Sequence, residues 1–150
     1  MHLNLHTDFG LRVLLYLAAS PEGTASAPDV AEAYGISLNH LRKVVQALSH
    51  GGYVQTTRGR TGGIALARRP DEIVIGQVVR ALEPDFRLVE CFEPKTNQCV
   101  VTSGCSLAHA IGDAQKAFLG VLDGYTLADV VRNKTYLWRL LSRPEAVARA

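Results

Sequence analysis

The residues best able to do chemistry in this chain are three cysteines, Cys91, Cys99 and Cys105, which fall within one fifteen-residue stretch. The chain shows neither a charged leader followed by an apolar run nor the roughly 18 apolar residues of a membrane span, so we expect a cytoplasmic protein. In a reducing compartment, three thiols make a poor disulfide framework. The pattern favours a metal or iron–sulfur site that takes one ligand from elsewhere.

The spacing of the thiols narrows the kind of site. Gaps of seven and five residues differ from the close cysteine pairs of structural zinc sites, which makes zinc the less favoured metal. Thiolates along a flexible loop can wrap an iron–sulfur cluster, which normally takes four protein ligands. Asp8, His109, His6 or an exogenous ligand could complete the set. Asp8 also fits an ordinary carboxylate in the first turn of a helix, and His109 an ordinary surface histidine.

A long helix is predicted directly after the thiols, from about Cys105 to Asp123, with Gly124 at its end. Its apolar residues recur at helical spacing: Leu107, Ile111, Ala114, Phe118 and Val121 or Leu122. One copy of a small domain has too little surface to cover such a face. The pattern therefore predicts pairing of this helix with a second copy of the chain.

Positive charge gathers in one segment, between Ala33 and Pro70, which contains no Asp or Glu although the formal net charge of the chain is only +2. Its basic residues are Arg42, Lys43, Arg58, Arg60, Arg68 and Arg69. A field of one sign confined to one segment favours a polyanion, most commonly nucleic acid. A solvated basic surface is the alternative.

The same segment contains a helix-turn-helix pattern. A first, mostly buried helix is predicted after an N-cap at Thr7, and a second opens at Ser26 and ends at Gly35. Ser37 is the expected N-cap of a third helix, from Leu38 to about His50. Its apolar stripe is Leu41, Val44, Val45 and Leu48, and Asn39, His40, Arg42, Lys43 and Gln46 lie largely off it. Such a helix is expected to enter a major groove.

Two short strands, 53–57 and 64–67, follow this helix and are joined by a glycine-rich tip that carries Arg58 and Arg60. A hairpin directly after a recognition helix forms a wing, and small glycines beside arginines suit close approach to phosphates or a minor groove. An ordinary hairpin beside a packed helix pair is the alternative. A further helix is expected within 73–83, ended by Pro84, and a last short one after Thr126.

The chain resembles the winged-helix iron–sulfur regulators, a family that includes IscR-type and RirA-type proteins. The resemblance covers nearly the whole chain and rests on the segments 7–12 (TDFGLR), 34–41 (YGISLNHL), 58–63 (RGRTGG), 75–80 (IGQVVR) and 125–129 (YTLAD). Segments 82–84 (LEP) and 88–91 (LVEC) are most similar to the nitric-oxide-sensing members. No Ser-His-Asp, nucleotide or metallohydrolase motif is present, so we do not expect an enzyme.

The resemblance implies that Cys91, Cys99 and Cys105 hold the cluster and that Asp8 from the partner subunit completes it, with [4Fe-4S] favoured over [2Fe-2S]. IscR-type members use a histidine three residues after the last cysteine. This chain has Ala108 there, with His109 one residue later, which favours Asp8. The seven-residue first gap also suits RirA-type iron sensors.

For DNA, the positions that match family contacts are Ser37, Asn39, Arg42, Lys43 and Arg58, and His40 and Arg60 are added from their place in the helix and wing. The resemblance implies a repressor that binds palindromic operator DNA as a homodimer and releases it when nitric oxide nitrosylates the cluster. Alternatives are an iron-responsive or cluster-status regulator, a zinc or thiol redox-sensing DNA-binding protein, and a small iron–sulfur electron carrier.

The expected fold class is mainly α with a small β-hairpin wing: a winged helix-turn-helix domain followed by a long dimerisation helix. Its 150 residues, 47% of them hydrophobic, suit one small domain with an attached arm. The expected division is a DNA-binding domain at 1–83 with the wing at about 53–67, a cluster-binding loop at 84–106, the dimerisation helix with a short following helix at 105–135, and a C-terminal tail at 136–150.

Overall fold

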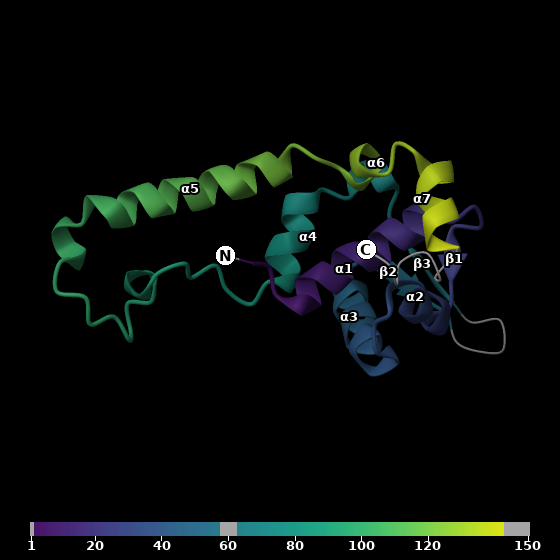
Figure 1. The fold of residues 1–150 in the computed structure, drawn as a ribbon, viewed down its shortest axis with the longest axis horizontal. Coiled ribbons are helices and arrows are strands. Elements are labelled where there is room, and N and C mark those ends of the chain that lie inside the picture. The colour runs from purple at the N-terminus through teal and green to yellow at the C-terminus, as the bar shows by residue number, and fades with distance from the viewer. Residues whose placement is uncertain (1, 58–62, 143–150) are drawn as a thin grey trace.

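The fold is mainly helical, and the structure, a computed structural model, describes residues 2–57 and 63–142 (Figure 1). With η marking short 3-10 helices, the elements follow the order α1 (Leu5–Ala19), β1 (Thr24–Ala25), α2 (Ala27–Tyr34), α3 (Leu38–His50), β2 (Val54–Thr56), β3 (Ile64–Leu66), η1 (Pro70–Glu72), α4 (Ile75–Leu82), η2 (Glu90–Phe92), η3 (Thr102–Gly104), α5 (Ser106–Asp123), α6 (Leu127–Val130) and α7 (Lys134–Leu141). The predicted fold class, mainly α with a small β wing, is confirmed.

Helix α1 forms the centre of the body, since α3, α4, α6, α7 and β3 all pack against it. Its N-cap is Asn4, whose side chain accepts a hydrogen bond from the Thr7 backbone N–H at 2.7 Å. The prediction of Thr7 as the N-cap is therefore wrong. Thr7 is completely buried instead, and its hydroxyl donates to the Glu83 carboxylate at 2.7 Å. This bond joins the first turn of α1 to the end of α4.

Helices α2 and α3 form the predicted helix-turn-helix. Ser26 and Asp29 make a reciprocal capping box at the start of α2, and Gly35 ends that helix in the left-handed conformation, with φ of 63°. The Ser37 side chain then accepts from the His40 backbone N–H and caps α3. The predicted bounds of α3 are confirmed because a cap, an apolar stripe and a glycine stop all lie within the segment itself.

The wing belongs to a three-stranded antiparallel sheet with strand order β1-β3-β2. Val54 faces Leu66 and Thr56 faces Ile64 across β2 and β3, which confirms the predicted hairpin. Its tip at 58–62 lies outside the described residues. The prediction lacked β1, a two-residue strand that pairs with β3 on the other edge.

The cysteine-containing chain runs outward from the end of α4, and the long helix α5 then runs back toward the body, so that the two form a projecting arm (Figure 1). Helix α4 joins this arm to the body, since it contacts both α1 and α5. At the junction Arg80 forms a two-pronged ion pair with Asp123, one arm of which measures 2.7 Å. Its hydrogen bonds hold the pKa of the Asp123 carboxyl below the usual value.

The C-terminal segment differs from its prediction. Residues that sequence reasoning assigned partly to a tail at 136–150 form α7, which packs against α1. Trp138 stands edge-on to the Tyr16 ring, with centroids 5.4 Å apart. The chain therefore returns to the N-terminal body after the α5 arm. Residues 143–150 lie outside the described part.

Candidate nucleic-acid interface and cysteine loop

The polar face of α3 lies on the surface of the body, as predicted. Leu41, Val44 and Leu48 are almost completely buried beneath it. The outward residues are exposed: Ser37, Asn39, His40, Arg42, Lys43 and Gln46. This alternation fixes the rotation of α3 about its axis, because the buried stripe must face α1. A helix with donors, acceptors and two cations on its open face has the chemistry to read base edges and phosphates.

The six basic residues of the charged segment do not all serve this face. Arg69 pairs with Asp71 at 2.7 Å, and Arg68 donates to the Gly51 carbonyl at 3.2 Å while its guanidinium lies 5.2 Å from the Tyr53 ring centroid. These contacts hold the Arg68 side chain against the C-terminal end of α3. Within residues 2–57 and 63–142, Arg42 and Lys43 form no ion pair with an acidic side chain. Arg58 and Arg60 lie outside the described residues.

The three cysteines all lie on the loop between α4 and α5, and all are free thiols. Cys91 sits in η2 and Cys105 directly precedes α5; both are half-buried, and Cys99 is exposed. The loop does not gather them by itself: among the described residues, no three His, Cys, Asp or Glu side chains are grouped closely enough to hold a metal ion. A complete site needs a rearranged loop and a donor from elsewhere.

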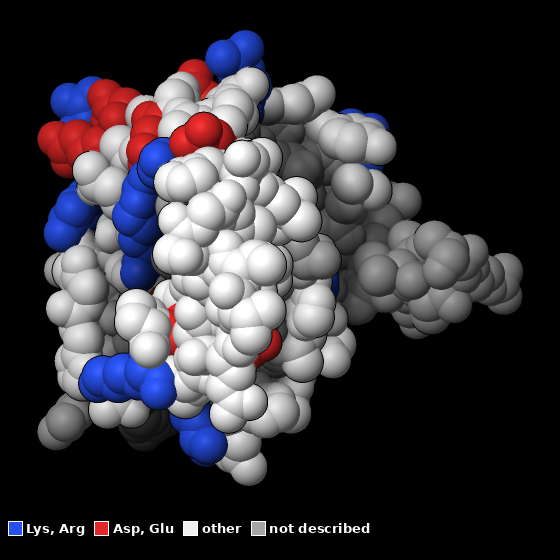
Figure 2. All heavy atoms as spheres, turned by 90° about the vertical axis from the view of Figure 1, so that its left-hand side faces the viewer, with Lys and Arg blue, Asp and Glu red and all other residues white. Residues whose placement is uncertain are grey.

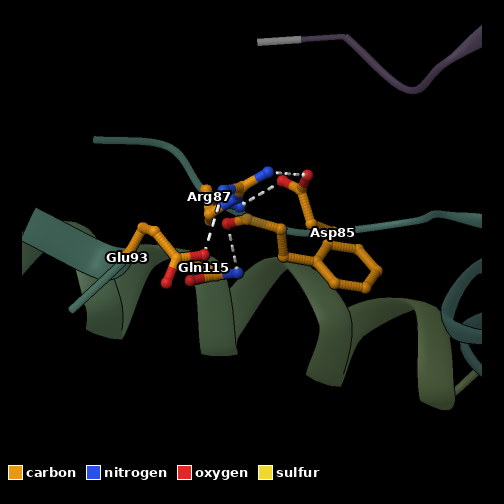
Figure 3. Close-up of polar contacts among 5 residues, drawn as sticks. Asp85, Arg87, Glu93 and Gln115 are labelled. Atoms are coloured by element: carbon orange, nitrogen blue, oxygen red, sulfur yellow. Dashed lines mark hydrogen bonds and ion pairs between the residues drawn. The ribbon is translucent and has the colours of Figure 1, made fainter. Parts of the chain in front are cut away.

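The start of this loop is fastened to itself and to α5 by contacts that sequence reasoning missed (Figure 3). Arg87 donates to Asp85 at 2.7 Å and to Glu93 at 3.0 Å, and the hydrogen bonds from the Arg87 side chain and backbone to Asp85 lower the pKa of the Asp85 carboxyl. Gln115 of α5 donates to the Phe86 carbonyl at 2.7 Å. A cavity of about 690 Å³ separates part of this segment from α5. Local charge alternation was the only sequence signal for these pairs.

Asp8, the candidate fourth ligand, lies in the first turn of α1 and forms an ion pair with Arg12 at 2.8 Å. Its side chain is 38% exposed, so it remains accessible. The Arg12 guanidinium lies 5.7 Å from the Tyr34 ring centroid, and burial raises the Tyr34 pKa to about 12. Within one chain Asp8 does not join the cysteines. His109 is exposed on α5, and His6 is half-buried on α1.

Helix α5 carries two apolar faces rather than the single predicted stripe. Ile111 and Phe118 are half-buried on the inner side, next to the loop. A second row remains exposed on the outer side and repeats with alternating steps of three and four residues: Leu107, Ala110, Ala114, Ala117 and Val121. Figure 2 views the end of this arm and shows a largely uncharged surface toward the viewer. Val100, beside Cys99, is 94% exposed.

A winged helix-turn-helix with an exposed polar recognition helix, joined to an apolar helical arm, defines this protein as a DNA-binding regulator. The sequence profile of the Rrf2 family, described as iron-dependent transcriptional regulators, matches residues 3–133. The chain belongs to the Rrf2 family. It is therefore a transcriptional regulator of a non-enzymatic family, as the sequence predicted.

Curated relatives span nearly the whole chain. It is 49% identical to the HTH-type transcriptional regulator NsrR of Bacillus subtilis over 146 residues, covering 97% of this chain and 100% of that protein. NsrR of Geobacillus kaustophilus is 49% identical over 142 residues, with coverage of 94% and 97%. The resemblance predicted from the sequence is thus confirmed at the level of these relatives, which are named as HTH-type transcriptional regulators.

Solved structures agree with the fold. IscR of T. potens matches with a TM-score of 0.68 at 27% identity, covering 89% of this chain and 88% of that one. CymR of B. subtilis, described as its global cysteine regulator, matches with a TM-score of 0.66 at 28% identity, covering 88% and 97%. Within the described ranges, none of the helices is both long and apolar enough to cross a membrane.

Proposed function

We propose that this chain is an iron–sulfur-cluster-dependent transcriptional repressor. It binds palindromic operator DNA as a homodimer in the cytoplasm, with Cys91, Cys99 and Cys105 as cluster ligands and Asp8 of the partner subunit as the fourth, at a cluster of the [4Fe-4S] type. Bound there, the cluster would supply a reactive iron centre that nitric oxide nitrosylates, and the protein would then release its operator.

The observation that carries this proposal is the donor set on the loop between α4 and α5. All three cysteines of the chain lie there as free thiols, and none is fully buried. Thiolates are the usual protein ligands of iron–sulfur clusters, so the residues present fit this group. Three donors leave one position open. Asp8 can fill it only from outside this loop, and its half-exposed carboxylate is available to a neighbouring chain.

The DNA-binding half of the proposal rests on α3 and the wing. Asn39, Arg42 and Lys43 extend from the exposed face of a helix whose other face is locked against α1. Arginine suits bidentate contact with guanine, asparagine with adenine, and lysine with a phosphate. Ser37 and His40 lie at the start of α3, where recognition helices contact the bases. Arg58 and Arg60 would act from the wing tip.

The homodimer is supported by the outer row of α5. Leu107 is 67% exposed and Val121 is 62% exposed, and steps of three and four residues are those of a helix that packs against a second helix. Two-fold pairing would also supply the missing donor, because each loop could then receive Asp8 from the other chain. Two recognition helices related by a two-fold axis read a palindromic site.

Anaerobic purification with iron and sulfide counts, followed by nitric oxide titration, tests the proposal. Operator DNA selected from random duplexes is the probe, and binding is followed by anisotropy while the visible spectrum is recorded. We expect loss of the cluster absorption and release of DNA to follow the same nitric oxide dose. DNA binding that ignores nitric oxide would refute the effector, and a colourless protein with stoichiometric zinc would refute the cluster.

The fourth ligand is tested with a matched pair of variants. Asp8→Ala should remain dimeric yet lose its cluster faster to a chelator, whereas His109→Ala should behave as the wild type. The reverse result would transfer the role to His109. An iron-responsive regulator is the second candidate function, favoured by the family's description as iron-dependent regulators. DNA binding that follows iron supply rather than nitric oxide would establish it.

A further inference from the structure

We propose that Arg68 is a positioning residue for DNA binding, which fixes the wing against the C-terminal end of the recognition helix α3. This inference rests on the proposed function, since it concerns how the same wing is presented to DNA. Arg68 lies just after β3, at the base of the hairpin. Its Nη2 donates to the carbonyl of Gly51, the residue that ends α3, at 3.2 Å. The second strand of the hairpin is therefore tied back to the helix that precedes the hairpin.

Tyr53 forms the other connection between α3 and the wing. Its backbone N–H donates to the Leu48 carbonyl of α3 at 2.9 Å, and its carbonyl accepts from the Ala67 N–H at 2.9 Å. The Tyr53 side chain is buried, and the Arg68 guanidinium lies over its ring, 5.2 Å from the centroid. An arginine in this position is attracted to the ring face. One side chain thus holds both the helix end and the first residue of the hairpin.

The junction that these contacts secure consists of two glycines, Gly51 and Gly52, and glycine is the least restrained residue of a backbone. Gly52 has a φ of 69°, and a Cβ added there would lie 3.0 Å from the Arg68 Nη2. The guanidinium therefore packs directly on the junction. Helix α3 is already fixed by its buried stripe. The orientation of the wing is the remaining variable, and Arg68 acts on it.

Holding the wing in place favours DNA binding because a segment that is ordered beforehand need not be ordered when DNA binds. Arg68 is exposed, and among residues 2–57 and 63–142 no acidic side chain pairs with it, so direct contact with a phosphate is the competing role. The two roles predict different salt dependence. Each phosphate contact adds about 0.9 to the slope of log K against log salt, whereas a residue that only holds the wing adds nothing.

Two substitutions and a matched control test the role in the full-length, cluster-loaded dimer. Arg68→Ala removes both contacts, and Arg68→Met removes the hydrogen bond but keeps an apolar stem over Tyr53, so it replaces Arg68→Ala if that variant does not fold. Arg69→Ala is the control, because it removes the same charge from the adjacent residue, whose partner is Asp71. The probe is a duplex that the wild-type protein selects from random sequence. Circular dichroism and thermal unfolding accompany each binding curve.

We expect Arg68→Ala to weaken binding of this duplex roughly 4- to 100-fold, because each of two subunits loses a hydrogen bond worth about a factor of two to ten. The salt slope should stay that of the wild type. Arg69→Ala should bind within about twofold of the wild type, as expected for an exposed ion pair. In the free Arg68→Ala protein, backbone hydrogen exchange should be faster in segments 53–57 and 64–67 and unchanged in α3.

A double-mutant cycle supplies a readout that a general loss of stability would not move. In a protein that already carries Arg58→Ala and Arg60→Ala, the wing has lost its two arginines, so adding Arg68→Ala should weaken binding by less than about threefold. In a protein that carries Arg42→Ala, the same substitution should have its full effect, because Arg42 acts from α3.

The outcomes distinguish the two proposals. A wild-type protein that selects no duplex would overturn the DNA-binding half of the proposed function and the positioning role together. A wild type that binds, with an Arg68→Ala variant of equal affinity, would overturn the positioning role alone. A salt slope lowered in that variant by about 0.9 for each lost contact would do the same, because Arg68 would then bind a phosphate. An undiminished effect in the protein without wing arginines would also refute it.

Discussion

Replacing Leu107 on the outer row of α5 should weaken dimerisation by a predictable amount. Leu107 is 67% exposed in the single chain. Complete burial of a leucine contributes about 1.5–3 kcal/mol, so covering the exposed part contributes about 1–2 kcal/mol. A two-fold dimer contains this side chain twice, which gives about 2–4 kcal/mol. The nearly isosteric Leu107→Asn should therefore raise the dimer Kd roughly 30- to 700-fold.

Sedimentation equilibrium over a range of protein concentrations measures this constant. Lys116→Asn is the matched control: it introduces the same residue on the same helix, at a side chain that is 81% exposed and lies off the outer row. Helix content by circular dichroism must remain equal in both variants. An unchanged dimer constant for Leu107→Asn, or an equal loss in the control, would refute the assignment of the outer row as the interface.

Three further expectations concern the body of the protein. Arg42→Ala should cost about 1–3 kcal/mol of operator affinity without changing the visible spectrum of the cluster; unchanged gel shifts would contradict the contact. Gly10→Val should lower the free energy of unfolding, measured by urea denaturation, by about 1–3 kcal/mol, because a Cβ at Gly10 collides with the Leu82 side chain. An unchanged urea midpoint would show that Leu82 moves aside. Hydrogen bonds from Thr126 hold the Asp129 pKa at about 2. Because this value is depressed, the stabilisation is present above the ordinary carboxyl pKa and is lost as the pH falls through about 2. Asp129→Asn should remove this loss of stability at low pH from acid-unfolding curves, and curves identical to those of the wild type would refute the role of Asp129.

Local signals predicted the recognition helix, and distant contacts decided what the sequence reading missed. Ser37, the buried stripe and the terminal glycine all belong to α3 itself. At α1, Asn4 and Thr7 are both plausible caps. The choice depends on Glu83, 76 positions from Thr7, because its carboxylate accepts a hydrogen bond from the Thr7 hydroxyl. The two residues of β1 are a strand only because they pair with β3.

The candidate site was predictable in composition but not in arrangement. The sequence places three thiols on one loop, yet the contacts that organise the loop join residues eight positions apart at Glu90 and 29 apart at Gln115. Periodicity found the apolar residues of α5 but merged two faces, because apolar side chains surround much of that helix. Only the position of α4 and the loop separates half-buried Phe118 from exposed Val121.

The geometry of α4 determines how the loop can influence the body. Gly10 lets α1 approach Leu82 near the end of α4, and Gly76 lets the start of α4 approach Asp123 of α5, since a Cβ at either glycine would collide with those residues. Both helix contacts are thus closer than a residue with a side chain at the glycine position would allow. Closely packed interfaces resist gradual sliding and change instead between discrete arrangements. A displacement at the start of the cysteine loop, which follows α4 directly, must therefore either stop at these glycine contacts or move α4 as a unit against α1, the helix on which α3 is packed.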